Sequence, residues 1–252
     1  MKKSTKYLIG SLSIVCFGAL AIWNLKDHSN EIIDNDTASI VISADYPVTS
    51  ELDDMISEAD MVVVGKYLNF DSKWNMARDP EDITKEDPEN FVEGRLYQFK
   101  VDQVVKGADS SEIIKVNHRV SETLKVEESD AVIAANGTVK KSATWESSHE
   151  VVNQDPLYIA PNIGSKYMVF LKYDEMQNNY YGAIEPFSIK FNDEDIAELQ
   201  SNIKNTSDHH FSSKKNINGK TIEITNHVES TIDDKISGLS FENLKQYVED
   251  NH

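Results

Sequence analysis

An uncharged apolar run near the N-terminus is the feature that most restricts what this chain can form. Residues 7–25 contain no charged side chain and follow Lys2, Lys3 and Lys6. A helix of these 19 residues is long enough to span the hydrocarbon core of a bilayer. Because basic residues mark the cytoplasmic end of such a helix, we expect a cell-membrane protein with a cytoplasmic N-terminus and its soluble part outside.

Residues 1–26 fit either a signal-anchor helix or a cleavable signal peptide. The small-x-small pattern at 19–21 is typical of a signal-peptidase site, and cleavage after Ala21 would give a secreted protein. A retained helix would place Trp23 at the outer interface, where an indole ring is favoured. Lipidation at Cys16 is the weakest alternative, because no small residue directly precedes it. The anchor is the favoured interpretation.

The charge and cysteine content restrict the partners of the soluble part. The formal net charge is −18, and without the four lysines of the first 26 residues it is −22, from 21 bases and 43 acids. Such a surface repels nucleic acid and anionic lipid. Cys16 is the sole cysteine, so the soluble part has no disulfide and no cysteine zinc site. A disulfide-free exported domain fits a Gram-positive bacterium better than an animal secretory pathway.

The pattern after the apolar run divides the chain into three parts. We expect an acidic spacer over 27–45, a β-barrel domain over 46–204 and a strand-and-helix extension over 205–252. Residues 27–60 contain ten acids and neither Lys nor Arg, which is typical of a solvated tail in their first part.

Short runs of β-branched and aromatic residues predict a mainly β (α+β) fold. They are dense at 61–68 and 167–171, and alternate with polar residues from Tyr97. Asn136-Gly137 predicts a hairpin over 131–145. The remaining strands are expected at 113–116, 180–184 paired with 187–191, and 222–224. Many short antiparallel strands without βαβ alternation predict an OB-like antiparallel barrel with a few short helices.

Helix signals are few. Apolar spacing predicts a short helix after Pro47 and a C-terminal helix capped by Ser240. Asn192 followed by acids predicts a third helix, with Ile196 and Leu199 on its apolar face. Loops are expected at 71–95, 119–156 and 205–216.

Several segments give a resemblance to a known family. The segments 59–66, 97–107 and 164–171 resemble a recurrent exported bacterial domain and the netrin-like module of the tissue inhibitors of metalloproteinases. The resemblance covers roughly 49–191 and implies an OB-like closed barrel. In the inhibitors an N-terminal cysteine chelates the zinc of the target protease. That chemistry does not carry over, because this domain contains no cysteine.

No catalytic, metal or cofactor signature is present. The chain lacks G-x-S-x-G, H-E-x-x-H and a P-loop. The acidic loop 71–95 lacks the calcium-loop pattern, so whether it binds calcium stays open. His209 and His210 are interpreted as loop residues, and His118 and His149 as isolated histidines.

These observations favour an extracytoplasmic binding module with an unidentified envelope protein or small ligand as partner. OB-like barrels bind along one face and its loops, so Trp74, Trp145 and Tyr158 are the candidate contact residues. Two alternatives remain. One is an envelope hydrolase with an unrecognised site, and the other is a protease inhibitor that acts without zinc chelation.

Overall fold

The computed structural model describes residues 37–44, 46–108, 111–127, 131–133, 139–141, 148–205, 209–217 and 220–252. Over these ranges the chain is mainly β with two helices, which confirms the fold class expected from strand patterning. No helix within them is long and apolar enough to cross a membrane. Residues 1–26, with the proposed membrane segment, lie outside the described ranges.

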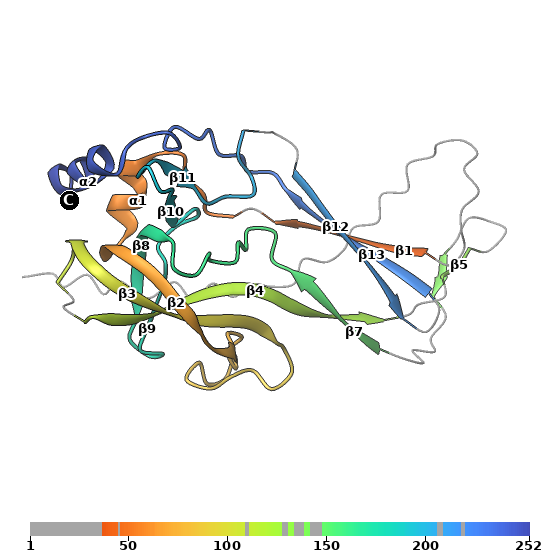
Figure 1. Ribbon diagram of the computed structural model, residues 1–252. Helices are drawn as coiled ribbons and strands as arrows, with labels where there is room; N and C mark the ends of the chain where they lie inside the picture. The colour runs from red at the N-terminus through yellow and green to blue at the C-terminus, as the bar shows by residue number, and fades with distance from the viewer. Residues whose placement is uncertain are drawn as a thin grey trace, which may run out of the picture.

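Five strands are joined edge to edge in a closed circuit of pairings (Figure 1). β2 pairs antiparallel with β3 and β8, and β3 pairs antiparallel with β4. β9 completes the circuit, because it is antiparallel to β8 and parallel to β4. The bounds are β2 (Met61–Asn75), β3 (Val92–Lys106), β4 (Ile113–Glu127), β8 (Lys166–Asp174) and β9 (Asn179–Gly182).

Alternate residues of these strands meet in one buried aromatic cluster. Side chains of successive strand residues point to opposite faces, so every second residue of β2, β3, β4 and β8 reaches the same interior. Tyr67 and Phe99 are fully buried there, with ring centroids 4.9 Å apart in an edge-to-face arrangement. The cluster consists of Met61, Val63, Tyr67, Tyr97, Phe99, Ile114, Val116, Tyr167, Val169, Leu171 and Phe187.

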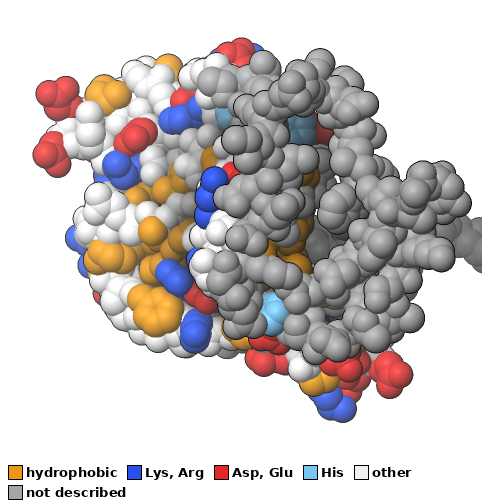
Figure 2. All heavy atoms as spheres, turned by 90° about the vertical axis from the view of Figure 1, so that its right-hand side faces the viewer, with side chains coloured by type: hydrophobic (Ala, Val, Ile, Leu, Met, Phe, Trp, Pro, Cys, Tyr) orange, Lys and Arg blue, Asp and Glu red, His pale blue; other side chains and the backbone are white. Residues whose placement is uncertain are grey.

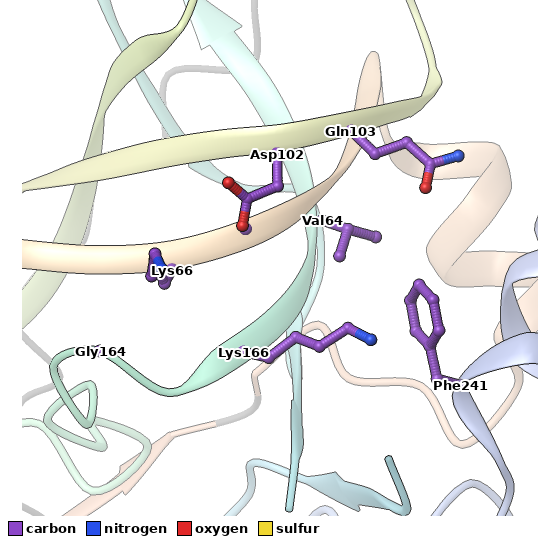
Figure 3. A pocket seen from close by; sticks show the side chains of 8 residues that line it. Val64, Lys66, Asp102, Gln103, Gly164, Lys166 and Phe241 are labelled. Carbon is purple, nitrogen blue, oxygen red and sulfur yellow. The ribbon is translucent and has the colours of Figure 1, made fainter. Parts of the chain in front are cut away.

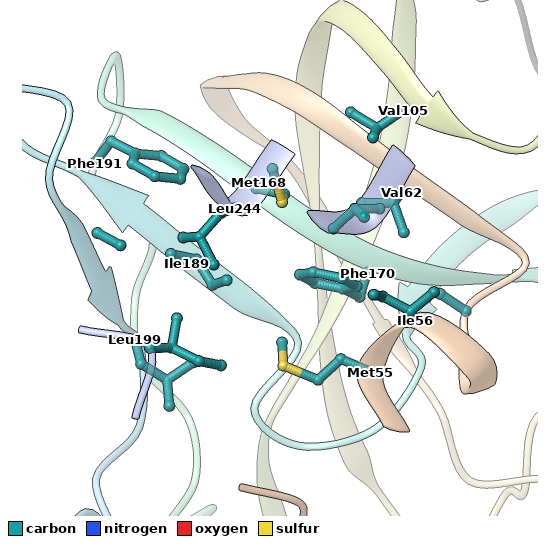
Figure 4. Packing of buried hydrophobic residues seen from close by; sticks show 14 of the residues in the cluster. Met55, Ile56, Val62, Val105, Met168, Phe170, Ile189, Phe191, Leu199 and Leu244 are labelled. Atoms are coloured by element: carbon teal, nitrogen blue, oxygen red, sulfur yellow. The ribbon is translucent and has the colours of Figure 1, made fainter. Parts of the chain in front are cut away.

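The opposite face of β2 and β8 packs against both helices (Figure 4). α1 (Leu52–Glu58) buries Met55 and Ile56 there, and α2 (Phe241–Asp250) buries Leu244 and Val248. β10 (Ser188–Phe191) and β11 (Ala197–Leu199) extend the sheet beside β8 and contribute Ile189 to this cluster. The Ser240 hydroxyl accepts from the Asn243 amide, as expected for the cap of α2.

A second sheet lies against the far end of β4 and against β7 (Ser148–Gln154). Its order is β1 (Thr37–Ala44), β13 (Lys220–Val228) and β12 (His209–Ile217), with β1 parallel to β13. Val151 of β7 packs with Ile222 and Ile224 of β13. The amides of Asn153 and Asn226 donate to each other at 3.1 and 2.8 Å. In Figure 1 this sheet extends away from the end that holds the helices.

The hairpin expected over 131–145 corresponds to β5 (Ala131–Ile133) paired with β6 (Val139–Lys141). Its turn lies outside the described residues. Figure 2 views this end of the molecule. Acidic side chains gather at its edges, and hydrophobic side chains interspersed with Lys and Arg lie beside the segments drawn in grey.

Several expectations about local structure are wrong. The loops expected over 71–95 and 119–156 are shorter, because β2, β3, β4 and β7 extend into these ranges. The helix predicted after Asn192 is instead a turn followed by β11, because the Asn192 side chain accepts from the amides of Glu194 and Ile196 and closes the chain on itself. Part of the spacer expected over 27–45 forms β1, which pairs with β13 and packs Ile40 and Ile42, both partly buried, against Ile222 and Ile224. The loop expected over 205–216 mostly forms β12.

Candidate functional site

Three lysines form a row across three neighbouring strands. Lys66 of β2 is the direct cross-strand partner of Lys100 on β3 and of Lys166 on β8. Directly paired residues share one face of a sheet, so the three side chains leave the same face. This is the face that α2 covers further along β2, because Val64 packs in the helix-covered cluster. We call Lys66, Lys100 and Lys166 the lysine row.

A bulge in β3 places a carboxylate beside the row. Val64 pairs with Gln103 and Gly65 pairs with Val101, so Asp102 is the extra residue between them. A bulge increases the local twist and redirects the side chain of the extra residue. Gly65 permits this geometry, because a Cβ at this position would overlap the backbone carbonyl of Lys100.

Two members of the row, Lys66 and Lys166, line a groove of about 410 Å³ together with Asp102 of the bulge (Figure 3). One wall is formed by Val64, Gly65 and Lys66 of β2 with Asp102 and Gln103 of β3. The opposite wall is formed by Gly164, Lys166 and Phe241, the first residue of α2. This volume lies within the usual range for ligand pockets. We call this cavity the lysine groove.

The charges of the lysine groove are only partly paired. Lys166 Nζ lies 2.9 Å from Asp195 Oδ1 and 3.3 Å from the centre of the Phe241 ring, a cation–π contact. Lys100 Nζ lies 3.7 Å from Asp102 Oδ1. The Lys66 ammonium group has no hydrogen bond or ion pair with any residue that the structure describes. One ammonium group is therefore left without a counter-charge.

A group of polar side chains lies in the interior of the strand circuit. His118 Nε2 lies 3.0 Å from the Tyr67 hydroxyl, and the Tyr97 and Tyr158 hydroxyls lie 2.9 Å apart. Burial lowers the pKa of the His118 imidazole to about 3, so the ring is neutral at physiological pH. Burial also raises the pKa of the Tyr67 hydroxyl well above 10.

Two carboxyl groups border this interior. Burial, reinforced by the nearby charge of Asp155, raises the pKa of Glu185 to about 8. Burial likewise raises the pKa of Asp155, and the attraction of Arg119 opposes that shift. Arg119 Nη1 donates to Asp155 at 2.9 Å and its Nη2 donates to Glu122 at 2.8 Å. The guanidinium therefore holds Asp155 and Glu122, whereas Glu185 has no side-chain hydrogen bond with a described residue.

The aromatic residues predicted as contacts do not meet in one site. The Trp74 indole donates to Asn117 Oδ1 at 2.9 Å. Both side chains lie on the same face of β3 as Gly94, because a Cβ at Gly94 would meet them. Tyr158 lies on the opposite side with Tyr97, near Arg95, the residue after Gly94. Both aromatic side chains are partly buried. Trp145 lies outside the described residues.

The acids and histidines singled out in the sequence have structural partners. In the loop after β2, Asp82 accepts from Thr84 and Asp87 accepts from Asn90. No group of three or more His, Cys, Asp or Glu side chains in the described ranges is arranged to hold a metal ion. His209 is buried in β12, and the His210 ring stacks on His227 at 4.7 Å.

The lysine row was missed because its signal is three-dimensional. Lys66, Lys100 and Lys166 each stand at an ordinary strand position, and only the register of β2 with β3 and β8 brings them together.

Comparison of the chain with protein-family models, with curated proteins and with solved structures finds no match.

Proposed function

We propose that this chain is an exported binding module whose ligand site is the lysine groove. The observation that carries the proposal is the groove itself, a cavity of ligand size with one uncompensated ammonium group and an aromatic wall. Its lining offers charge, an amide and apolar surface, which are the means of recognition. The lining contains no serine, threonine, cysteine or histidine, so it lacks the hydroxyl or thiol and imidazole pair that many hydrolases use.

The scaffold of this module is an OB-like barrel. Five strands in a closed circuit, with a single parallel pair between β4 and β9, support this assignment. The resemblance to the netrin-like module points to the same architecture. Ligand recognition on the outer face of such a barrel places the site on paired strands, which hold side chains more rigidly than loops do.

Its location is the outside of the cytoplasmic membrane. Support comes from the uncharged run of 7–25 behind three lysines, and from the acidic, cysteine-free remainder of the chain. The protein is either anchored by this helix or released by cleavage after Ala21. Its partner is a small ligand or an envelope component that reaches the lysine groove from outside.

The alternative of an envelope hydrolase has less support. His118 contacts Tyr67 rather than a serine or cysteine, and Tyr67 is fully buried. A tyrosine whose pKa is raised well above 10 is a weak nucleophile at neutral pH. The pair is therefore better explained as a satisfied polar contact in the interior.

Two measurements test the proposal. In intact cells that express the full chain, externally added protease should degrade residues beyond the apolar run without cell lysis. Protection of the whole chain would overturn the export. In a thermal-shift screen of small molecules, compounds should raise the Tm of the full chain and should fail to raise that of Lys66→Glu, because a ligand stabilises the state that binds it. Equal shifts for both proteins would overturn the groove as the site.

A further inference from the structure

The lysine row has an electrostatic cost that its neighbours relieve only in part. Like charges at directly opposed positions of a sheet are destabilising, and Lys66 is directly opposed by a lysine on each side. Asp102 lies near Lys100, and Asp195 pairs with Lys166. The central ammonium group is left without such a partner among the described residues. An anion bound in the groove would relieve this repulsion.

The charge of the groove specifies a monovalent anion. Among the residues that line the groove, Lys66 and Lys166 with Asp102 leave a local charge of +1, within a chain whose formal net charge is −18. The surrounding acidity repels extended polyanions such as nucleic acid at long range. A compact ligand with a single negative charge matches the site without adding further repulsion.

The other walls specify what the anionic group is attached to. Phe241 and Val64 form the apolar part of the lining, with 8% and 4% of their surface exposed, and the Gln103 side chain adds an amide with both donor and acceptor atoms. The Lys166 ammonium group already lies over the Phe241 ring. An anionic ligand group beside that ring would therefore lie near Lys166 as well as Lys66. Figure 3 shows the Lys166 side chain reaching toward Phe241 across the groove.

From this geometry we infer that the lysine groove binds a small organic carboxylate with an apolar or aromatic body. The carboxylate pairs with Lys66, the Gln103 amide donates to it, and the body lies against Phe241 and Val64. The inference rests on the proposed function and names the ligand class of the same site. A charge-assisted hydrogen bond from Lys66 then supplies a large share of the affinity.

The test is isothermal titration of the full chain with matched probes. Acetate, benzoate and phenylacetate carry the predicted charge, phenylacetamide is the neutral counterpart of phenylacetate, and phenyl phosphate carries the competing anionic group. We expect phenylacetate to bind at least tenfold more tightly than phenylacetamide. If the ion pair is exposed to solvent, the affinity for phenylacetate should fall at least tenfold between low salt and physiological salt. All titrations therefore use one fixed ionic strength.

Two variants locate the binding. Lys66→Gln removes the uncompensated ammonium group, and we expect it to weaken phenylacetate binding by at least tenfold. Lys73→Gln is the matched control, because Lys73 is an exposed lysine on the same strand with no ion pair to a described residue. It should leave the affinity unchanged. Thermal unfolding of both variants verifies that they are folded.

Each contrary result overturns the inference in a recognisable way. Equal affinity for phenylacetate and phenylacetamide, or an equal loss in both variants, excludes the carboxylate contact with Lys66. Tighter binding of phenyl phosphate assigns the groove to phosphates instead. If none of the carboxylates binds at 10 mM (~2.7 kcal/mol) while thermal-shift hits still depend on Lys66, the proposed function stands and the ligand class is wrong.

Discussion

His118 Nε2 lies 3.0 Å from the Tyr67 hydroxyl in the interior of the strand circuit, where the two rings are packed among other aromatic residues. Both residues are buried away from water, so this contact gives each of the two polar atoms a hydrogen-bond partner. The contact holds β2 and β4 together across the circuit, between residues 51 positions apart in the chain. Its energetic importance can be measured directly.

The first prediction concerns Tyr67→Phe, which removes the hydroxyl and leaves the imidazole nitrogen without this partner. We expect the free energy of unfolding to fall by about 1–3 kcal/mol, the usual cost of an unsatisfied buried polar group. Denaturant unfolding measures it. Tyr173→Phe is a suitable control, because its exposed hydroxyl donates to Asn178 and should cost less than about 1 kcal/mol. Equal losses would mean that the buried contact has no special weight.

The second prediction concerns acid. The pKa of His118 is lowered from 6.5 to about 3 by burial, so between these values the unfolded chain binds a proton that the folded chain does not. Stability should therefore fall as the pH falls from 6.5 toward 3. NMR titration of the His118 ring protons checks the cause, since the ring should show no protonation above pH 5. A midpoint near 6.5 would contradict it.

The third prediction concerns alkali. Burial raises the pKa of Glu185 from 4.5 to about 8, so between these values the folded chain holds a proton that the unfolded chain has lost. Stability should fall as the pH rises toward 8. Below 6.5 the opposite slope of His118 offsets this loss, so the wild type should be most stable between 4.5 and 6.5.

Glu185→Gln isolates the alkaline contribution, because its amide cannot ionise. The variant should gain roughly 3–4 kcal/mol over the wild type between pH 5 and pH 8, in unfolding measured at both values. Glu175→Gln, in the exposed turn after β8, should track the wild type at both. A constant difference between Glu185→Gln and the wild type would exclude a buried proton at Glu185.

Local chemistry in the sequence predicted the strands well but not how they pair. The β-branched run at 61–68 and the alternation from Tyr97 become β2 and β3, because such residues fit a pleated, half-buried surface. Residues 180–184 and 187–191 were expected to pair with each other. Instead β9 and β10 each pair with β8, since β9 completes the circuit to β4.

Errors arose where a side chain has two possible uses. Asn192 followed by acids satisfies the requirements of a helix cap and also those of an Asx turn, and the structure adopts the turn. The candidate site was unpredictable for a related reason. The lysine row depends on register, and the register depends on the bulge at Asp102, which nothing in the local sequence marks.

The fourth prediction concerns the second sheet. Ile224 of β13 is fully buried against β7, whereas Val41 of β1 is 59% exposed. Ile224→Ala should lower the free energy of unfolding by about 2–4 kcal/mol, because it leaves a cavity. Val41→Ala should change it by less than about 0.5 kcal/mol. If both changes are small in urea unfolding, the second sheet does not share the cooperative core.

The fifth prediction joins stability to recognition. Lys66 faces a lysine on each neighbouring strand, so Lys66→Gln should raise the free energy of unfolding by about 0.2–1 kcal/mol in the absence of ligand. Lys73 is opposed by one cation, Arg95 on β3, so the gain from Lys73→Gln should be smaller. A site that is retained at a cost in stability is typical of a functional surface, since activity and stability often oppose each other.

The gain in stability from Lys66→Gln should shrink in 1 M salt, where the screening length for exposed charges is about 3 Å. If Lys66→Gln is instead less stable than the wild type, the ammonium group is held by contacts within the fold, and the groove loses the free charge on which its selectivity for anions depends.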